Sequence, residues 1–516
     1  MPASDVVSVT AAPAIELRGI DKRFGAVHAV RDVSLAIGRG TVTGIVGENG
    51  AGKSTLMSIL YGLYQADSGE IRIDGEPAPI DGPRAAIARG IGMVHQHFML
   101  VDGFTVLENL VLGAEGGPLL AGGLAAARAE LARLGREYGL AVDPDARIAD
   151  LSVGEQQRVE ILKVLFRGAR ILILDEPSAV LTPQETDRLF RILATLRERG
   201  VTVVLITHKL REVMAATDRV FVMRQGRVVA ERRTADTGPE ELAELMVGRK
   251  VRLALDKAPG GAGEIRLKAE ALGLVDGRGV RLLDDVGLEL RAGEIVGIAG
   301  VSGNGQTELL QVLAGIRAPT AGRLTVCGRV IDRGHPADPA EMRALGLAHV
   351  PEDRLRQGLV GDFAAAESSI LGYHRQLPYC RHHVLSAPAV GAYCAELMER
   401  FDVRPRDPAL RSASFSGGNQ QKLVLAREMA RRPRVLLVGQ PTRGVDIGAI
   451  EFIHRELLKR RDEGCAILVV SVELDEILSL ADRLLVMFAG RIVGEVAARE
   501  ADERALGLMM AGAHAP

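Results

Sequence analysis

The chain has 516 residues, 47% of them hydrophobic, which predicts three or four globular domains with buried cores and excludes a disordered or fibrous protein. The 64 basic and 66 acidic residues leave a formal net charge of −2, which argues against a nucleic acid as the principal ligand. No apolar run approaches the roughly 18 residues of a membrane-spanning helix, and Met1 to Ile15 lacks the features of a secretory signal, so we expect a cytoplasmic protein.

The sequence contains an internal repeat. The segments GIVGENGAGKSTLMSILYGL near residue 47 and GIAGVSGNGQTELLQVLAGI near residue 300 stand 253 residues apart. Each continues into an apolar helical face, formed by Leu56, Ile59, Leu60 and Leu63 in the first copy and by Leu309, Val312, Leu313 and Ile316 in the second.

Later landmarks recur at an offset of 264, namely Ser152 with Ser416, Asp175 with Gly439 and His208 with Val472. The repeat predicts one domain over 1–248 and another over 264–516, joined by a linker over 249–263 that contains Pro and Gly. In each half, short apolar runs such as those at 41–47, 171–174 and 203–207 alternate with helical patterns, which predicts α/β domains built on parallel sheets. The four cysteines have no metal-ligand spacing, and we expect structural thiols at Cys327, Cys380, Cys394 and Cys465.

The first glycine-rich segment fits the phosphate-binding motif G-x-x-x-x-G-K-[ST] between a strand and a helix. Its backbone N–H groups and the helix N-terminus would bind phosphates, Lys53 would reach the β and γ phosphates, and the Ser54 hydroxyl would hold Mg²⁺. The predicted phosphate-binding residues are Gly47, Glu48, Asn49, Gly50, Ala51, Gly52, Lys53, Ser54 and Thr55.

Two further strand ends supply acid–base groups. The run 171–174 is followed by Asp175 and Glu176, at the sheet edge where α/β proteins bind ligands. Asp175 is the predicted metal-side residue and Glu176 the predicted general base. A predicted edge strand at 203–207 brings His208 to the same rim, where it could contact the γ phosphate. Taken singly, solvated acids and an ordinary surface histidine remain alternatives.

The segment from Leu151 to Gln157, LSVGEQQ, satisfies a helix capping box by itself, because Ser152 precedes Glu155 by three residues. In their order, however, the phosphate-binding loop, LSVGE, LILDEP and ITH resemble the ATP-binding subunits of ATP-binding-cassette (ABC) transporters, over both halves of the chain. The resemblance implies two tandem P-loop NTPase domains. Each would have a RecA-like parallel-sheet core, an antiparallel β subdomain and a helical subdomain.

The resemblance also implies roles for residues outside the phosphate-binding loop. Phe24 would stack on adenine, with a core phenylalanine as the alternative. Gln96 would contact Mg²⁺ and connect the site to a helical subdomain over about 97–150, whose surface docks on the membrane partner. His95 and His97 flank it without further metal ligands nearby. Within this subdomain, Thr105-x-x-Glu108 predicts a helix start.

The second half keeps the pattern but lacks the reactive groups. Gln306 replaces the lysine while Thr307 keeps a hydroxyl, which leaves nucleotide binding open. Gly439 and Gln440 replace the two carboxylates, Val472 replaces the histidine, and Glu352 stands where Gln96 stands in the first half. These losses predict a non-hydrolytic, degenerate site, formed by Ser152, Gly154, Gly303, Gly305, Gln306, Thr307, Glu352, Gly439, Gln440 and Val472.

The second half nevertheless carries FSGGNQ, which is closer to the family's LSGGQ signature than LSVGE is. In the family, two nucleotide-binding domains face each other head to tail, and each ATP lies between one phosphate-binding loop and the other domain's signature. The resemblance therefore implies one competent composite site, in which the first half's loop is completed by the signature residues Ser416, Gly417, Gly418 and Asn419.

Within the family, two nucleotide-binding domains fused in one chain, with V-P-E-D-R in the second, resemble the bacterial importer class for sugars and nucleosides. The segments GMVHQHFMLVDGFTVLENLVLG and DEPSAVLTPQE are most similar to the nucleoside (purine-type) subfamily, with ribose and galactose importers as the alternative. Remoter alternatives are a soluble tandem ABC ATPase acting on ribosomes or DNA and a metabolic P-loop kinase. The resemblance to importers implies ATP and Mg²⁺ as cofactors. It implies two transmembrane permease subunits and an extracytoplasmic solute-binding protein as partners, and no nucleic acid. The chain would then lie peripherally on the cytoplasmic face of a bacterial cell membrane.

Overall fold

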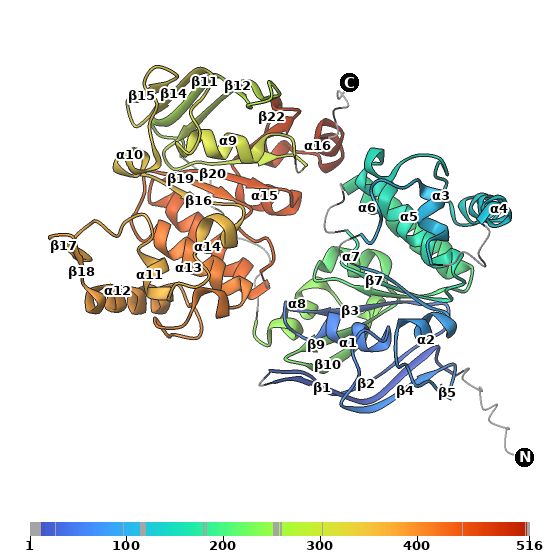
Figure 1. Ribbon diagram of the computed structural model, residues 1–516. Helices are drawn as coiled ribbons and strands as arrows, with labels where there is room; N and C mark the ends of the chain where they lie inside the picture. Colours follow the sequence, from blue (N-terminus) through green and yellow to red (C-terminus); the bar gives the residue numbers. More distant parts are fainter. Residues whose placement is uncertain are drawn as a thin grey trace, which may run out of the picture. The chain divides into compact units, whose positions relative to one another are not determined.

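The computed structural model describes residues 12–25, 27–95, 98–113, 120–178, 181, 183–250, 257, 261–301, 303–445, 447–510 and 512. The chain divides into two compact units, Met1–Val251 and Arg252–Pro516. Figure 1 shows that each unit has its own sheets and helices, with the first unit in blue to green and the second in yellow to red. Most of the expected linker, 249–263, lies outside the described residues.

The first unit opens with an antiparallel sheet in the strand order β2-β1-β4-β5. Its strands are β1 Ile15–Phe24, β2 Val27–Ile37, β4 Ser68–Ile73 and β5 Glu76–Pro77. In β1, Ile15, Leu17 and Ile20 are all buried, although they do not follow a strict two-residue period. The register against β2 shifts between Leu17 and Ile20, and this irregularity returns the strand's apolar side to the core.

The central sheet of the first unit has the order β10-β9-β3-β8-β7-β6, with β10 antiparallel to β9 and the other pairs parallel. Its strands are β3 Val42–Gly47, β6 Ile91–Val94, β7 Ile171–Asp175, β8 Thr202–Ile206, β9 Arg219–Arg224 and β10 Arg227–Arg233. Every residue of β3, β7 and β8 is buried, as expected for strands covered on both faces. The prediction of an edge strand at 203–207 is wrong, because β8 lies between β3 and β7.

The helices of the first unit are α1 Lys53–Leu60, α2 Pro83–Ala88, α3 Val106–Val111, α4 Leu120–Tyr138, α5 Val153–Phe166, α6 Pro183–Glu198, α7 Leu210–Ala216 and α8 Pro239–Val247, with short 3-10 turns at Ile148–Asp150 and Thr234–Asp236. α3 begins with the expected capping box, in which the Thr105 side chain accepts from the backbone N–H of Glu108.

The apolar face predicted after each glycine-rich segment is shorter than expected. α1 buries Leu56, Ile59 and Leu60 and ends there, while Leu63 is 48% exposed. The second copy behaves in the same way, and Ile316 is 49% exposed. A glycine with positive φ, Gly62 in the first unit and Gly315 in the second, turns the chain out of the helix before the last apolar residue.

The second unit repeats this plan. Its antiparallel sheet has the order β12-β11-β14-β15, and its central sheet has the order β16-β19-β20-β13-β21-β22, which matches β6-β7-β8-β3-β9-β10. The strands are β11 Ile265–Val275, β12 Arg281–Arg291, β13 Ile295–Ala299, β14 Ala321–Val326, β15 Arg329–Asp332, β16 Leu347–Val350, β17 Cys380–Arg381, β18 Val384–Leu385, β19 Val435–Gly439, β20 Ala466–Ser471, β21 Arg483–Phe488 and β22 Arg491–Ala497.

The helices of the second unit are α9 Gln306–Leu313, α10 Pro339–Ala344, α11 Ala365–Ser369, α12 Ala387–Arg400, α13 Gly417–Met429, α14 Ile447–Asp462, α15 Leu474–Leu480 and α16 Glu503–Met510, with shorter turns at Arg354–Gly358, Ser412–Ser414 and Ala498–Glu500. Each unit thus combines a mostly parallel sheet, an antiparallel sheet and a helical layer, which confirms the predicted fold class. In the part of the chain that is described, no helix has both the length and the apolar character needed to cross a membrane.

Two of the four cysteines expected to be structural lie in the core, whereas Cys327 and Cys380 are only partly buried. All four are free, and Cys394 and Cys465 are buried. Burial raises the pKa of Cys394 to about 11 and that of Cys465 to about 12, so neither thiol is activated for reaction at neutral pH.

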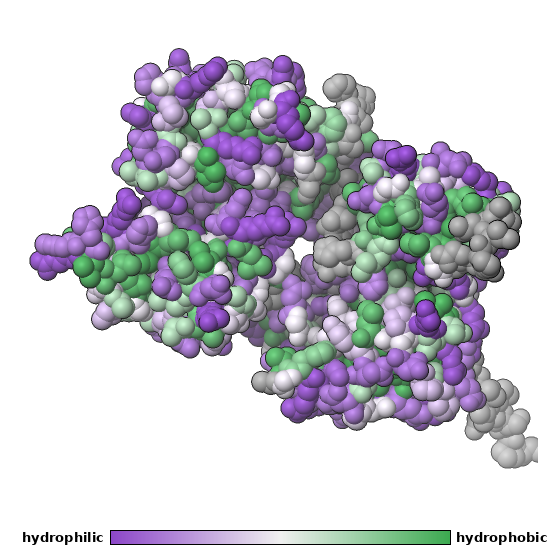
Figure 2. Space-filling view, viewed as in Figure 1, coloured by the Kyte–Doolittle hydropathy of each residue, from purple (hydrophilic) through white to green (hydrophobic). Residues whose placement is uncertain are grey.

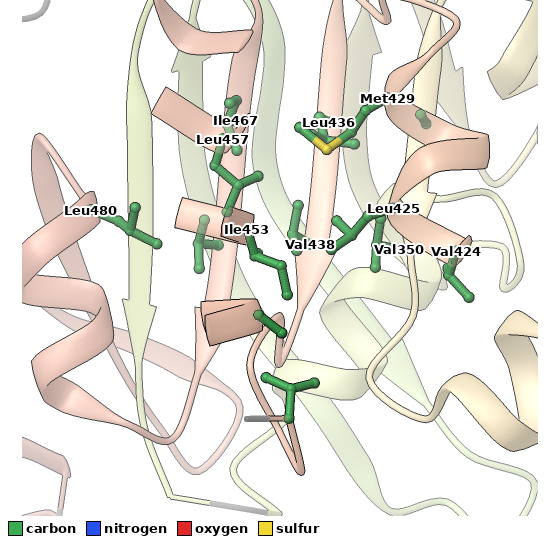
Figure 3. Close-up of a cluster of buried hydrophobic side chains, with 14 of the residues drawn as sticks. Val350, Val424, Leu425, Met429, Leu436, Val438, Ile453, Leu457, Ile467 and Leu480 are labelled. Carbon is green, nitrogen blue, oxygen red and sulfur yellow. The ribbon is translucent and has the colours of Figure 1, made fainter. Parts of the chain in front are cut away.

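The core of the second unit is built around β19. Figure 3 shows Leu436 and Val438 of this strand between side chains of α13, including Met429, and side chains of α14, including Ile453. Leu436 is fully buried. We therefore expect Leu436→Ala to lower the free energy of unfolding by about 2–5 kcal/mol, because the removed methyl groups leave a cavity.

Circular dichroism during urea unfolding measures this effect. Val330→Ala, at a position that is 45% exposed, is the control and is expected to change the free energy of unfolding by less than about 0.5 kcal/mol. Equal effects of the two substitutions would contradict the assignment of Leu436 to a tightly packed core.

Candidate functional site

The phosphate-binding motif lies in the turn between β3 and α1. Gly50 and Gly52 have φ values of 82° and 98°, in the region that favours glycine. A Cβ atom at Gly47 would lie 2.3 Å from the carbonyl oxygen of Met223, and one at Gly52 would lie 2.4 Å from that of Ala29. Gly47 and Gly52 are thus required by the close approach of neighbouring backbone, and Gly50 by its positive φ, which together give the turn its shape at the N-terminus of α1. Such a turn is suited to binding an anion.

Lys53 is the first residue of α1 and is only 5% exposed. Its Nζ donates to the carbonyl oxygens of Gly47, at 2.7 Å, and Glu48, at 3.0 Å. Burial lowers the pKa of Lys53, while the negative charges of Glu176, Asp175 and Glu48 act in the opposite direction. Phosphate oxygens would compensate the desolvation of this ammonium group, so the position fits a polyphosphate ligand.

Asp175 ends β7 and is 7% exposed. The hydroxyl of Ser54 donates to its Oδ1 across 3.4 Å. Burial raises the pKa of Asp175, whereas the hydrogen bond from Ser54 lowers it. A hydroxyl oxygen next to a carboxylate oxygen is the kind of hard ligand pair that Mg²⁺ prefers, so these two residues fit a magnesium ion.

Glu176 and His208 form a pair at the same sheet edge. Glu176 has a φ of 47°, and its N–H donates to the carbonyl oxygen of Ile206 at 2.9 Å. Its Oε1 lies 3.0 Å from Nδ1 of His208. Burial by itself would raise the pKa of Glu176, but the hydrogen bond and charge of His208, together with Lys53, lower it. Glu176 is therefore ionised at neutral pH and able to accept a proton from water.

The parallel register explains why these groups meet. Asp175 pairs with Ile206 across β7 and β8, and Ile45 of β3 also pairs with Ile206. The carboxyl ends of the three strands consequently lie side by side, and the residues that follow them share one edge.

Phe24 ends β1 and is 43% exposed, which rules out the alternative of a core phenylalanine. Its ring meets that of Tyr64 edge to face, with centroids 5.1 Å apart, and Nζ of Lys22 lies 5.5 Å from its centroid. Tyr64 is 46% exposed and was missed in the sequence, although an exposed aromatic directly after the phosphate-loop helix is a signal that could have found it. The pair offers an aromatic surface on which a base could stack.

Gln96 and His97 lie outside the described residues. His95 is described, and its ring meets that of Tyr61 edge to face, with centroids 6.0 Å apart. Burial lowers the pKa of His95.

The chain just beyond this segment is held by α5. Glu160 accepts from the N–H of Met99 at 2.7 Å, and Nζ of Lys163 donates to the Met99 carbonyl at 2.6 Å.

Glu160 and Lys163 were not identified from the sequence. Because Glu160 is 2% exposed, this contact fastens the segment after Gln96 to the helix that begins at the first signature.

The first signature forms the N-terminus of α5. Ser152 is its N-cap and makes the expected capping box with Glu155. Nε2 of Gln157, in the first turns of the same helix, donates to the carbonyl oxygen of Pro177 at 2.6 Å. A Cβ atom at Gly154 would lie 2.5 Å from Oε1 of Glu185. The signature is thus fixed to the segment that follows Glu176.

The second unit preserves the backbone of the site but not its lysine or its two strand-end carboxylates. Gly303 and Gly305 have φ values of 91° and 101°. Gln306 occupies the place of the lysine, is 5% exposed, and donates to the carbonyl oxygen of Val301 at 3.1 Å. Thr307 donates to the carboxylate of Glu352. A neutral amide therefore replaces the ammonium group.

At the end of β19, the space that a side chain at position 439 would need is already filled. Gln440 has a φ of 48°, nearly that of Glu176, and its Oε1 accepts from the N–H of Val472 at 3.3 Å. A Cβ atom at Gly439 would lie 2.5 Å from Cγ of Glu352. The Glu352 side chain thus occupies the space that an aspartate at position 439 would need.

The second signature forms the N-terminus of α13. Ser416 is its N-cap, and Nδ2 of Asn419 donates to the Ser416 hydroxyl at 2.8 Å. A Cβ atom at Gly417 would lie 2.5 Å from an Arg354 nitrogen and 2.8 Å from the Gly444 carbonyl oxygen. Glycine is therefore required at this position, and Arg354 of V-P-E-D-R, whose role was not predicted, packs against the signature.

The structure brings Lys53, Ser54, Asp175, Glu176 and His208 together at one edge of the first unit. It places Ser416, Gly417, Gly418 and Asn419 at one helix N-terminus of the second unit. The corresponding edge of the second unit has Gln306, Thr307, Glu352, Gly439, Gln440 and Val472.

Known proteins are similar in sequence to this chain over nearly its whole length. The sequence model of the ABC transporter family matches residues 30–179 and 283–443. The nucleoside import ATP-binding protein NupA of Lactococcus lactis subsp. cremoris is 45% identical over 498 residues, which cover 96% of this chain and 98% of the relative.

The guanosine import ATP-binding protein NupO of Bacillus subtilis is 45% identical over 500 residues, covering 96% of this chain and 97% of the relative. The ribose import ATP-binding protein RbsA of Chromobacterium violaceum is 41% identical over 484 residues, covering 93% and 94%. The chain therefore belongs to the ABC transporter family, as an ATP-binding protein that carries two ABC domains in one polypeptide.

Proposed function

We propose that this chain hydrolyses ATP at a single competent site and thereby drives the import of nucleosides through a membrane permease. The observation that carries the proposal is the difference between the two units. The first unit gathers a buried ammonium group, a hydroxyl–carboxylate pair and a carboxylate–imidazole pair at one sheet edge. The second unit has Gln306, Gly439 and Val472 at the corresponding positions.

Each group of the first unit has a chemical role in this proposal. The N–H groups of the phosphate-binding loop and Lys53 would hold the phosphates of ATP. Ser54 and Asp175, together with Gln96, would hold Mg²⁺, which supplies positive charge to the phosphate oxygens. Glu176 would orient the attacking water and accept its proton, and His208 would keep the Glu176 carboxylate in place. Phe24 would stack on adenine.

The signature of the second unit would complete this site from the other side. Ser416 and the N–H groups of Gly417 and Gly418, at the start of α13, are suited to a γ phosphate. The first signature has Val153 where the second has Gly417, and this valine is 39% exposed. A bare helix N-terminus beside the capping serine is better suited to an anion than one that carries an isopropyl group. Ser152 and Gly154 would accordingly face the degenerate site.

The proposed role in import also implies partner proteins. The relatives named for import support a complex with two transmembrane permease subunits and an extracytoplasmic solute-binding protein. The chain would sit on the cytoplasmic face of a bacterial cell membrane and associate with it through the permeases.

Nucleosides are the proposed solutes because two relatives at 45% identity are named for nucleoside and guanosine import. A monosaccharide such as ribose is the second candidate, since a glucose import protein of Haloferax volcanii is 44% identical and a ribose import protein 41% identical. We expect cells that lack this chain to lose high-affinity uptake of labelled nucleosides, while uptake of labelled ribose and galactose persists.

Complementation with the wild-type chain should restore nucleoside uptake, whereas the Glu176→Gln variant should not. Loss of ribose uptake with normal nucleoside uptake would assign the chain to sugar import instead.

A further inference from the structure

The second unit carries a hairpin, β17–β18, between α11 and α12 (Figure 1). Cys380 pairs with Leu385 and Arg381 with Val384, so the turn consists of His382 and His383. Both histidines have positive φ, 52° and 64°. Two-residue turns of this kind usually contain Asn-Gly, because at positive φ the Cβ atom of most residues lies too close to a backbone carbonyl oxygen. The hairpin therefore presents two imidazole rings at its tip despite the backbone strain.

Exposed apolar and basic side chains surround this turn. Leu377, Val384 and Leu385 are 73%, 69% and 54% exposed. Arg375 and Arg381 are also exposed, and within the described residues neither makes an ion pair or a side-chain hydrogen bond. Residues 368–395 contain no Asp or Glu. In Figure 2 the hairpin appears as a hydrophilic purple tip with hydrophobic green residues beside it. The surface is thus both cationic and apolar.

The base of the hairpin is fixed by a cage of tyrosines around one arginine. The Arg431 guanidinium lies 4.3 Å from the ring centroid of Tyr373, 5.3 Å from that of Tyr379 and 5.5 Å from that of Tyr393. It also donates to Oε1 of Gln376 at 2.8 Å. Such cation–π contacts are stabilising, especially when partly desolvated. Arg431 lies two residues after the end of α13, so the hairpin is anchored to the helix of the second signature.

We propose that the β17–β18 hairpin binds anionic phospholipid headgroups at the membrane surface. Unpaired arginines are attracted to an anionic leaflet, and exposed leucine and valine side chains lower their free energy at the boundary between headgroups and acyl chains. In the proposed function, on which this inference rests for the location of the chain, the chain lies at a membrane surface, so such a leaflet would be nearby. Because residues 368–395 contain no Asp or Glu, the hairpin has no acidic group that would repel an anionic surface. This inference goes beyond the proposed function, and its test does not depend on ATP hydrolysis.

Co-flotation of the full-length chain with vesicles provides the test. We expect binding to vesicles of phosphatidylglycerol and phosphatidylcholine, little binding to phosphatidylcholine alone, and weaker binding as the salt concentration rises. The double variant Arg375→Glu/Arg381→Glu should bind at least about 25-fold more weakly, since each arginine near an anionic surface contributes about fivefold. Leu377→Ser/Leu385→Ser should weaken binding without changing the net charge.

The matched control is Arg323→Glu/Arg329→Glu, which makes the same change in net charge at exposed positions of the antiparallel sheet. It should retain wild-type binding, and the thermal unfolding of all variants should match that of the wild type. Equal loss in the control and the hairpin variant would overturn the proposal, since binding would then follow the total charge. Wild-type vesicle binding by the hairpin variant, with loss of permease-stimulated ATPase activity, would show that the hairpin docks on a protein instead.

Discussion

Glu176→Gln is expected to reduce permease-coupled ATP hydrolysis by about 10²- to 10⁴-fold, the usual effect of removing a general base. The amide cannot accept a proton from water, whereas the carboxylate, whose pKa is lowered mainly by His208 against the effect of burial, can do so at neutral pH. ATP binding should persist, because Lys53, Ser54 and the loop N–H groups are unchanged. The measurements are steady-state ATPase activity of the chain assembled with its permease in lipid and equilibrium binding of labelled ATP.

The second unit offers a matched control for this substitution. Gln440 has nearly the same φ as Glu176 and follows the equivalent strand, so Gln440→Glu makes the reverse exchange in the same backbone setting. We expect it to change ATPase activity far less, because Gln306 and Val472 stand where the first unit has Lys53 and His208. If Glu176→Gln kept near-normal activity, the general base would be another group.

Ser416→Arg is expected to abolish ATPase activity nearly as fully as Lys53→Ala, although Ser416 belongs to the unit with the degenerate site. In the proposed composite arrangement, a long cationic side chain at the start of α13 would occupy the place of the γ phosphate and prevent closure. Ser152→Arg should leave more activity, because Ser152 would face the degenerate site. The comparison uses steady-state ATPase activity of each variant with its permease in lipid.

These two serine variants are matched in their structural effect. Ser416 and Ser152 are both exposed N-caps of signature helices, so losing either cap should cost a similar free energy of unfolding, about 0.5–2 kcal/mol. A difference in activity between them therefore reports their place in the ATP sites and not a loss of stability. Greater damage from Ser152→Arg would mean that each site is completed within its own unit.

Local features were the ones that the sequence could predict. The phosphate-binding loop and the caps at Thr105 and Ser152 depend on residues close together in the chain, because turn geometry and capping are set by near neighbours. The central strands could also be located, because their apolar runs are continuous in the sequence. The internal repeat predicted that the second unit has the same architecture as the first, and both units do share one strand order. The ABC family assignment rests on the order of these local motifs.

Non-local contacts were decided only by the tertiary structure. Strand order is one example, because an apolar run is the same for an edge and an interior strand, and β8 proved to be interior. Three other contacts join residues that are far apart in the sequence. They are the packing of Glu352 beside Gly439, the hydrogen bonds of Glu160 and Lys163 to Met99, and the tyrosine cage around Arg431. The sequence by itself thus determined the fold class and the residue types of the candidate site. Only packing between distant segments decided their surroundings, because burial and side-chain contacts depend on how those segments meet.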